Sequence, residues 1–463
     1  MSDPFRELRT LLGDRFSEDA AALGERVSDF GRILKRPPRA LARPATSAEL
    51  VAIVKWARSA KVPLVARGQA HSQSGLSLAD AAVAVEMTGE LAAVGAPDRG
   101  AGTIEAGGGA IWREVAAKAI AAGTIPPVLT NNLGVTVGGT LSVAGLGVAS
   151  FRHGCQGDQV LGMEVVTGAG DAVSCGPGRE QELFDAVRSG LGLCGFVAKA
   201  TLRVVPALPR VRTWYLLYDD LPSLMKDTQR LMTEGRFGYL ESWCVPCPQG
   251  FRKVDGVPSP FAQWFFPLHA SVEFSPDAPP DDRKALAGLS HYRQVHAEDR
   301  DLLEFANRLE PLFELWKRGG YWAAAHPWME AVLPWESAAS YITGVLANFP
   351  PHLLGGGHVL LWPSRGTTSK VPLFMVPKGD FAMGFGILPG LPPQAMPVAG
   401  PVLQRASDLA LRMGAKRYPS GWLDFDAARW KAHYGEMWPR LREWKKRFDP
   451  DGALNPGLLP LDA

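Results

Sequence analysis

The sequence predicts an α+β fold of two domains, and three observations support this prediction. Its 463 residues exceed what a single hydrophobic core usually supports. Residues 1–206 alternate short apolar runs and helical patterns with glycine-rich loops, whereas residues 207–415 hold most of the tryptophans and the alternating runs typical of an antiparallel sheet. Residues 416–463 carry an aromatic helical pattern and a turn-rich end, which predict a tail that packs back on the chain and not a third domain.

The composition limits the partners of the chain. Charged residues make up 21% of it and the net charge is +2, so no field is strong enough to favour nucleic acid or an anionic membrane. The five cysteines, an odd number, do not resemble a disulfide framework and fit a reducing compartment. Residues 1–16 lack the apolar core of a signal peptide, and no apolar run is long enough to cross a bilayer. We therefore expect a cytoplasmic protein that binds neither nucleic acid nor membrane.

The elements of the first domain follow from caps and apolar periodicity. Thr46 and Glu49 form a capping-box pattern ahead of apolar residues at helical spacing, so a helix is expected there. Pro206 closes the last apolar run and marks the expected domain boundary. The other expected elements are strands at 62–66, 82–87, 103–106 and 196–205, a hairpin of 160–167 with 171–175, and helices at 112–122 and 180–188.

The second domain is expected to be an antiparallel sheet with helices packed on it. Alternating runs predict strands at 239–245 and 269–274, and a helix is expected at 299–316. Cys244 and Cys247 have redox or metal spacing, but they lie in an alternating strand without a companion cluster, so packing is favoured and no metal site is expected. The tryptophans at 243, 264, 322, 328 and 362 either line a pocket for a planar ligand or fill the core.

Two glycine-rich loops of the first domain, 67–75 and 134–147, are candidates for binding phosphate. Without Cβ atoms the backbone N–H groups can approach an anion closely. The second loop holds so many glycines that irregular backbone is expected. Gly190 to Gly195 also matches G-x-G-x-x-G, but here a helix precedes the motif and a strand follows it, the reverse of the order in a dinucleotide fold. A nicotinamide site is therefore not expected.

These loops carry a family resemblance. Residues 66–72 (Ala-Arg-Gly-Gln-Ala-His-Ser) and 136–145 (Thr-Val-Gly-Gly-Thr-Leu-Ser-x-Ala-Gly) resemble the vanillyl-alcohol-oxidase or PCMH-type superfamily of FAD-linked oxidases. Within it, the closest resemblance is to cytokinin dehydrogenase, and it covers most of the chain but is weakest between 207 and 320. The further segments that carry it are 151–154, 183–187, 190–195, 326–328, 430–435 and 448–457.

The resemblance implies a two-part, PCMH-type FAD-binding domain, formed by 1–206 and 416–463, with a substrate-binding cap domain at 207–415. In that family the histidine at the position of His71 is bonded to the flavin ring methyl, so covalent FAD is expected. Some relatives add a cysteine link, but the matching stretch is Asn131-Asn132-Leu133, so one tether is expected. The residues carried over by motif to FAD are Ala66, Arg67, Gly68, Gln69, Ala70, His71, Ser72, Thr136, Gly138, Gly139, Ser142, Leu146, Val197, Tyr418, Asn455 and Leu458.

Asn131 is the main departure from the family pattern. Cytokinin dehydrogenases resemble this chain but place there an aspartate that takes a proton from the substrate amine, and an amide cannot act as a general base near neutral pH. Asn131 can still orient an amine or hydroxyl while Glu241 or Glu273, on strands of the second domain, accepts the proton. The other interpretation of both glutamates is a solvated position on a half-exposed strand. Ala70 is a second departure, because the family prefers glycine there.

The expected activity follows from the resemblance. It implies an FAD-dependent oxidase or dehydrogenase that takes a hydride from a carbon next to nitrogen or oxygen of a small planar substrate, with oxygen or another compound as electron acceptor. Two alternatives stay open: a tailoring oxidase of a specialised metabolite, and a non-catalytic flavin-binding module. Substrate specificity is expected to lie in the middle third of the chain, where the resemblance is weakest.

Overall fold

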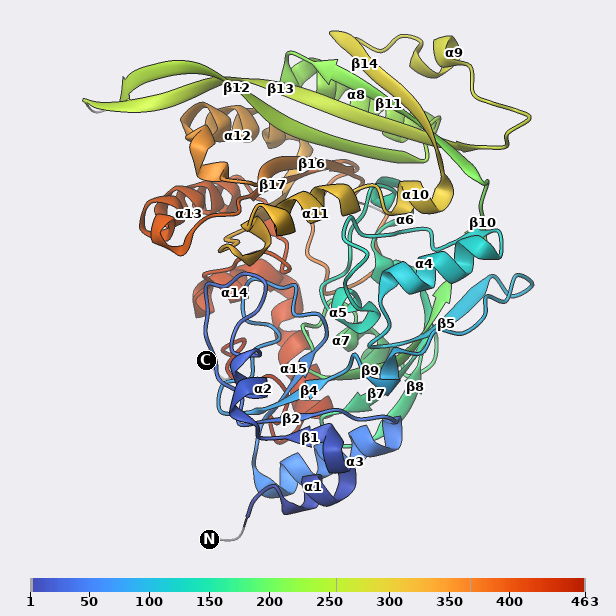
Figure 1. The fold of residues 1–463 in the computed structure, drawn as a ribbon, viewed down its shortest axis with the longest axis vertical. Helices are drawn as coiled ribbons and strands as arrows, with labels where there is room; N and C mark the ends of the chain where they lie inside the picture. Colours follow the sequence, from blue (N-terminus) through green and yellow to red (C-terminus); the bar gives the residue numbers. More distant parts are fainter. Residues whose placement is uncertain (1–2, 255, 367, 462–463) are drawn as a thin grey trace.

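The computed structural model describes residues 3–254, 256–366 and 368–461, and its elements form two parts stacked along the long axis (Figure 1). The part that holds the N-terminus also holds the tail helices α14 (Ala427–Tyr434) and α15 (Trp438–Phe448). Tail residues Trp430, Leu441 and Trp444 are buried in one cluster with core residues of the N-terminal segment. The tail therefore packs back on the first part, as the sequence predicts.

The first part contains two small sheets. In one, β1 (Phe16–Ser17), β2 (Ala40–Ala42), β4 (Val83–Glu86) and β3 (Leu64–Arg67) are neighbours in that order, with β2, β4 and β3 parallel. Helices α1 (Arg6–Leu12) and α3 (Ser47–Ala60) pack on it. Thr46 caps α3 as predicted, because its Oγ1 accepts a hydrogen bond from Glu49 N.

The second small sheet is antiparallel, in the order β5 (Thr103–Gly107), β9 (Gly195–Arg203), β7 (Val160–Thr167) and β8 (Ala172–Cys175). The predicted β7–β8 hairpin is confirmed. Helices α4 (Trp112–Ala121) and α7 (Gln181–Val187) pack with it, and β6 (Thr124–Ile125) pairs with β10 (Val205–Pro206). Short helices elsewhere are α2 (Ala20–Gly24), α6 (Ser150–His153) and α9 (Asp282–Leu286).

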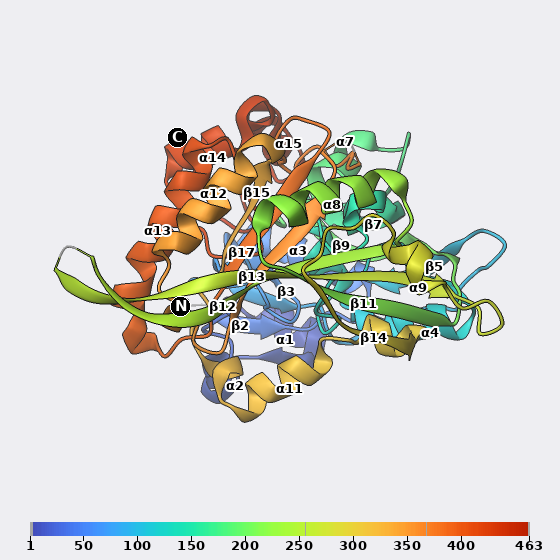
Figure 2. The ribbon, with the colours of Figure 1, turned by 90° about the horizontal axis from the view of Figure 1, so that it is seen from above.

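The second part is built on one large antiparallel sheet, which Figure 2 shows from above. Its strands, in spatial order, are β14 (Arg293–Asp301), β11 (Arg210–Tyr218), β13 (Val257–Phe274), β12 (Tyr239–Val254), β16 (His358–Ser364), β17 (Ala382–Leu388), β15 (Met329–Pro334) and β18 (Lys416–Arg417). The α+β prediction with an antiparallel second domain is therefore confirmed. The exact domain bounds stay a prediction. Strand β18 belongs to the large sheet of the second part although it lies just beyond residue 415, the predicted end of that domain.

Successive residues of a strand point to opposite faces, so each central strand of this sheet has two different sides. On β15, Met329, Ala331 and Leu333 belong to a buried core shared with α8 (Leu221–Glu234), α12 (Trp335–Asn348) and α13 (Met396–Arg412). Residues of the opposite phase, Trp328 and Glu330, line a cavity. One face of the sheet thus carries the helices and the other forms a wall of the cavity.

Two predictions of secondary structure are wrong. Segment 134–147 is not irregular throughout, since it contains the short helix α5 (Val137–Leu141), capped by Thr136 Oγ1. A Cβ on Gly138 would lie 2.9 Å from Gly108 O, so this glycine is needed for a close backbone approach within a helix.

The predicted helix at 299–316 is instead three elements. Strand β14 continues to Asp301, where Arg210 pairs with the carboxylate, and α10 (Leu302–Ala306) and α11 (Glu310–Arg318) follow as separate helices. Pro311 lies in the first turn of α11, and because it has no N–H group a helix starts there more readily than it continues through. Among the described residues no helix is long and apolar enough to cross a membrane.

Candidate active site

A cavity of about 290 Å³ lies between the two parts of the chain. Fourteen of the sixteen residues predicted to bind FAD line this cavity, and only Arg67 and Leu458 do not. Asn131 and Glu241 line it as well, whereas Glu273 does not. The fourteen are Ala66, Gly68, Gln69, Ala70, His71, Ser72, Thr136, Gly138, Gly139, Ser142, Leu146, Val197, Tyr418 and Asn455.

The two glycine-rich loops touch one another at this cavity. A Cβ added to Gly68 would lie 2.2 Å from Thr136 Oγ1, and one added to Gly108 would lie 1.8 Å from Val197 O. Glycine is therefore required at position 68 for the first loop to meet the Thr136 side chain of the second, and at position 108 for the backbone to meet strand β9. Ser72 and Ser77 line the cavity, and their buried hydroxyls have no partner within the described part of the chain. Because buried hydroxyls are normally hydrogen-bonded, these two fit a polar ligand such as FAD in the cradle.

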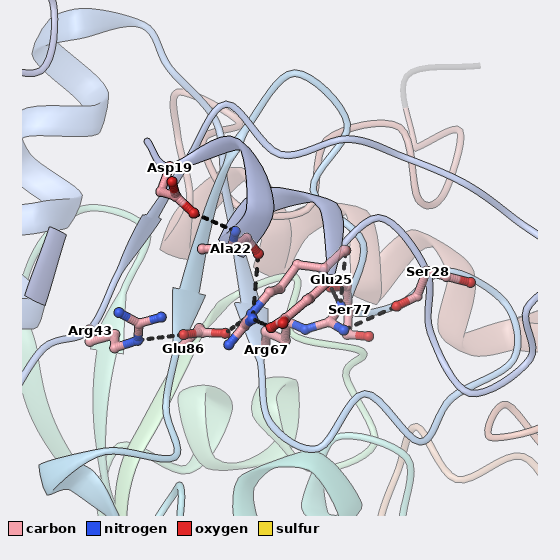
Figure 3. A network of polar contacts seen from close by, with 9 residues as sticks. Asp19, Ala22, Glu25, Ser28, Arg43, Arg67, Ser77 and Glu86 are labelled. Carbon is pink, nitrogen blue, oxygen red and sulfur yellow. Dashed lines mark hydrogen bonds and ion pairs between the residues drawn. The ribbon is translucent and has the colours of Figure 1, made fainter. Parts of the chain in front are cut away.

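Arg67 does not line the cavity, and its guanidinium lies in a network of polar contacts near Glu86 (Figure 3). Its guanidinium donates to the carbonyl oxygens of Ser28 at 3.0 Å and Ser77 at 3.3 Å. Burial lowers the pKa of Arg67, while Glu86 nearby pairs with Arg26 at 2.8 Å and Arg43 at 2.6 Å. Arg67 therefore supports the loop through these carbonyl oxygens and lies outside the cavity lining.

The tail contributes two of the predicted residues to the cavity and keeps one outside. Tyr418 is buried against Leu146 and Phe374, and Asn455 donates from Nδ2 to Leu191 O at 3.0 Å. Leu458 lies instead at a separate small pocket that Asn455 also borders. The loop around Gly192, dismissed as a nicotinamide motif, nevertheless lines the same cavity.

His71 is a neutral imidazole in the cavity wall. Burial, and secondarily the neighbouring His326, lowers its pKa from 6.5 to about 3. The ring of Phe30 lies 4.2 Å from that of His71 and is stacked on His326 at 4.1 Å. Nothing in the sequence pattern indicated Phe30, since it precedes the glycine-rich loop by about forty residues and contacts it only in the fold.

Asn132 fixes one nitrogen of His71. Gly134 N donates to Asn132 Oδ1 at 2.8 Å, which leaves the amide nitrogen of Asn132 to donate to His71 Nε2 at 3.2 Å. The stretch 131–133, where some relatives of the family carry a second linking residue, is therefore adjacent to His71. With Nε2 acting as acceptor, Nδ1 is the nitrogen left for another interaction.

Ala70 adopts a left-handed backbone conformation with φ of 52°. This conformation is strained for a residue with a Cβ, which gives a physical reason for glycine at this position in relatives. We predict that Ala70→Gly raises the free energy of unfolding by about 0.5–1 kcal/mol in urea denaturation, since relief of strain exceeds the entropic cost of glycine. The matched control is Ala428→Gly in α14, an exposed helical position where the same change should lower it. If both substitutions lowered the free energy of unfolding equally, Ala70 would not be strained.

Asn131, Glu241 and Arg308 form a closed triad at the cavity. Asn131 Nδ2 donates to Glu241 Oε1 at 2.6 Å, Arg308 Nη2 donates to Asn131 Oδ1 at 2.6 Å, and Arg308 Nε lies 3.2 Å from Glu241 Oε2. Burial alone would raise the pKa of Glu241, which is 3% exposed, but Arg308, His269 and the Asn131 hydrogen bond together lower it. Glu241 is therefore ionised at neutral pH, and an amide at 131 keeps the triad free of a second buried negative charge.

Glu273 and Arg308 mark the limits of the sequence predictions here. Glu273 accepts hydrogen bonds from the Tyr239 hydroxyl and from Leu208 N, at the first-part side of the sheet and outside the cavity. Arg308 was not predicted, because it lies in the turn between α10 and α11 where a continuous helix was expected. Only one of the two candidate glutamates thus reaches Asn131.

Breaking the triad is predicted to destabilise the protein. Arg308→Met leaves the Glu241 carboxylate buried without its partner, so the free energy of unfolding should fall by about 3–5 kcal/mol in urea denaturation. Adding Glu241→Gln should restore much of that loss. As a control, Arg113→Met removes the exposed pair with Glu310 and should cost at most about 1 kcal/mol. Additive losses in the Arg308 and Glu241 double variant would show that the two side chains do not interact.

Aromatic side chains enclose the rest of the cavity. Of the five tryptophans singled out, Trp328 and Trp362 line it, and Trp316 of α11 does so as well. Trp264 is buried in the core on the helix side of the sheet. His358 also lines the cavity, and burial lowers its pKa to about 4. This part of the wall is therefore aromatic, and its charged lining residues are the two glutamates Glu241 and Glu330.

Two family descriptions match this chain. Residues 38–176 match the FAD binding domain, and residues 281–458 match the domain described as cytokinin dehydrogenase 1, FAD and cytokinin binding. The first match includes both glycine-rich loops. The second includes Arg308 of the triad, Glu330 and Trp362 of the cavity lining, and the tail residues Tyr418 and Asn455.

Curated relatives match over nearly the whole length. Cytokinin dehydrogenase 6 of Oryza sativa subsp. japonica is 31% identical over 471 residues, which cover 93% of this chain and 88% of the relative. Cytokinin dehydrogenase 7 of the same plant is 28% identical with the same coverage. An uncharacterized oxidoreductase of the fasciation locus of Rhodococcoides fascians is 30% identical and covers 93% of this chain and 95% of the relative. The chain therefore belongs to the cytokinin dehydrogenase family and is an FAD-dependent oxidoreductase of that type.

Proposed function

We propose that this protein binds FAD through one covalent bond to His71 and oxidises a small planar substrate at a carbon next to nitrogen or oxygen. The observation that carries the proposal is the position of His71. It is a neutral imidazole at the meeting point of both glycine-rich loops and beside the stretch that holds Asn131. The alternative of a non-catalytic flavin-binding module gains no support from a cavity wall that carries an ionised glutamate.

The residues present fit FAD. Gly68, which has no Cβ, lets the first loop approach a ligand closely, and the free hydroxyls of Ser72 and Ser77 supply hydrogen-bond donors. The N–H groups of Val137 and Gly138 at the start of α5 are engaged with Ala110 O and Gly108 O, so they support the loop. Tyr418 and Asn455 enclose the cavity from the tail side. When bound, the flavin accepts a hydride and later passes two electrons to oxygen or another acceptor.

A single tether through Nδ1 of His71 agrees with the neighbours of this side chain. Nε2 accepts from Asn132, and no cysteine is found among the residues that line the cavity. The imidazole nitrogen of His71 would hold the flavin through the methyl carbon of its ring. Forming that bond would cost one N–H and one C–H bond, and oxygen would take up the two electrons and two protons released.

Glu241 is the proposed proton acceptor. Oxidation of an amine or alcohol removes a hydride from carbon and a proton from nitrogen or oxygen, which leaves an imine or a carbonyl. Asn131 orients the N–H or O–H group by hydrogen bonding, and the ionised Glu241, 2.6 Å from Asn131, takes the proton. Arg308 is a positioning residue, because its guanidinium holds Glu241 and Asn131 without lining the cavity.

The substrate class is proposed from the relatives and from the wall. The name of the matched domain and of the plant relatives points to cytokinins, which carry a C–H bond next to an amine nitrogen on a flat ring. Asn131 replaces the family aspartate and cannot accept a proton. This favours a second candidate substrate, a specialised metabolite whose N–H or O–H proton is acidic enough to be removed by Glu241 alone. The cytoplasmic location stays a prediction.

Anaerobic titration of the purified flavoprotein separates these candidates. Addition of isopentenyladenine, a cytokinin, should bleach the flavin absorbance if an amine of this kind is oxidised. Bleaching by aromatic alcohols alone would favour the second candidate. No bleaching with any planar amine or alcohol would contradict an oxidative function.

A further inference from the structure

A short segment near the N-terminus, residues 28–31, lies across the first glycine-rich loop and is bonded to its backbone. We call this segment the brace. The N–H groups of its last two residues donate to Ala70 O at 2.8 Å and to Ser72 O at 3.3 Å. These two acceptors directly precede and follow His71 in the chain. The brace therefore holds the backbone on both sides of the histidine proposed as the tether.

The brace is also fixed to the two ends of the loop. Arg67, at the start of the loop, donates to Ser28 O at 3.0 Å. At the end of the loop, Gly75 N donates to Asp29 Oδ2 at 2.8 Å, and the Asp29 carboxylate is 4% exposed. Contacts of this kind along the whole loop leave its backbone little freedom to move relative to the brace.

Phe30 of the brace packs on the imidazole itself. Its ring lies 4.2 Å from the ring of His71 and is also stacked on His326 at 4.1 Å with an interplanar angle of 6°. His326 belongs to the second part of the fold, and its N–H donates to the carbonyl oxygen of the brace residue at position 31 at 2.9 Å. The imidazole of His71 is thus held by Phe30 at a ring face and by Asn132 at Nε2.

We propose that Phe30 is a positioning residue for the covalent bond, because its ring fixes the plane of the His71 imidazole so that Nδ1 faces the methyl carbon of a bound flavin. This inference rests on the proposed function. Bond formation costs one N–H and one C–H bond, and oxygen takes up the two electrons and two protons released. Since alignment speeds a reaction without tightening binding, Phe30 should govern the rate of bond formation and hardly affect the affinity for FAD.

The test follows bond formation in the full-length protein, purified without flavin from cells starved of riboflavin. After FAD is added at saturation in air, acid precipitation of samples over time gives the rate at which flavin enters the pellet. The FAD analogue without its two ring methyl groups cannot form the bond. Quenching of its fluorescence therefore gives the dissociation constant separately, and neither measurement depends on substrate turnover.

Phe30→Leu removes the ring and keeps an apolar side chain. The rate of bond formation is expected to fall about tenfold, as loss of one aromatic pair of about 1.4 kcal/mol would produce, while the dissociation constant of the analogue hardly changes. Phe30→Tyr keeps the ring and should restore most of the rate. Gly31→Ala keeps the Phe30 ring, but its Cβ would lie 2.7 Å from Gln73 Cα, so it should displace the brace and slow bond formation as well.

Phe425→Leu is the matched control. Phe425 is a half-buried phenylalanine that also packs on a histidine, His433 at 5.9 Å, but it lies outside the cavity lining. The loss of an aromatic ring is the same in both variants, so this one should leave both the rate and the dissociation constant at their wild-type values.

Two results overturn the inference while the tether stands. A wild-type rate in Phe30→Leu and Gly31→Ala would show that the brace does not align His71. A loss of affinity for the analogue as large as the loss of rate would show that Phe30 supports the loop as a whole and not the imidazole. If the wild-type protein itself leaves all the flavin in the supernatant, the tether fails and this inference fails with it.

Discussion

Replacing His71 with alanine is expected to abolish covalent flavin. The imidazole is the only candidate nucleophile placed by both the first glycine-rich loop and Asn132 among the cavity-lining residues of the described chain. After precipitation with acid, the wild-type pellet should be yellow, whereas in His71→Ala all the colour should stay in the supernatant. The variant should still bind FAD, since the loops, Thr136 and the free serine hydroxyls are unchanged.

His352 supplies the matched control for this experiment. It is exposed and lies away from the cavity lining, so His352→Ala should keep the yellow pellet. Asn132→Ala removes the hydrogen bond to Nε2 but not the nucleophile, so tethering should become slower without being lost. A yellow pellet from His71→Ala would place the tether on another residue.

Glu241→Gln is expected to lower the rate of flavin reduction by about 10²- to 10⁴-fold, the usual contribution of a general base. Gln fills the same volume and can still hydrogen-bond Asn131, but it cannot accept a proton. The affinity for substrate should change little, because the ring is held by the aromatic wall. Anaerobic stopped-flow mixing of the flavoprotein with isopentenyladenine measures both quantities, since the amplitude and the limiting rate separate binding from chemistry.

Glu273→Gln is the control for the proton acceptor. Its carboxylate contacts Tyr239 and Leu208 outside the cavity, so the limiting rate should stay at the wild-type value. Equal losses in the Glu241 and Glu273 variants would point to a general effect on the sheet. A full rate in Glu241→Gln would mean that water or another group takes the proton.

The fold could be predicted where local signals agree with the final structure. The cap at Thr46, the turn between β7 and β8, and the alternating runs of the second part all act over a few residues, and each prediction was confirmed. The helix in the second glycine-rich loop could not be predicted, because the close contact of Gly138 with Gly108 overrides its low helix propensity. The break at Pro311, by contrast, has a local signal, because proline favours the first turn of a helix.

The residues of the candidate site also fall into two groups, those that a local sequence motif predicts and those that only the fold brings together. Residues on the two loops were predicted because a contiguous motif carries them, and most of these line the cavity. Arg308, His358 and Glu330 come from separate elements of the second part, and their meeting depends on the order of strands β12, β16, β17 and β15. Register across non-consecutive strands leaves no pattern in a single sequence. Arg67 shows the converse, since this residue lies within a binding motif but contacts the carbonyl oxygens of Ser28 and Ser77 instead of lining the cavity.

The central claim is that FAD is bonded to His71, and peptide mass measurement of digested wild-type protein tests it most directly. The peptide that contains His71 should be heavier by the mass of FAD less two hydrogen atoms, and fragmentation should place the added mass on the imidazole. An unmodified His71 peptide, recovered in full from freshly prepared yellow protein, would contradict the tether.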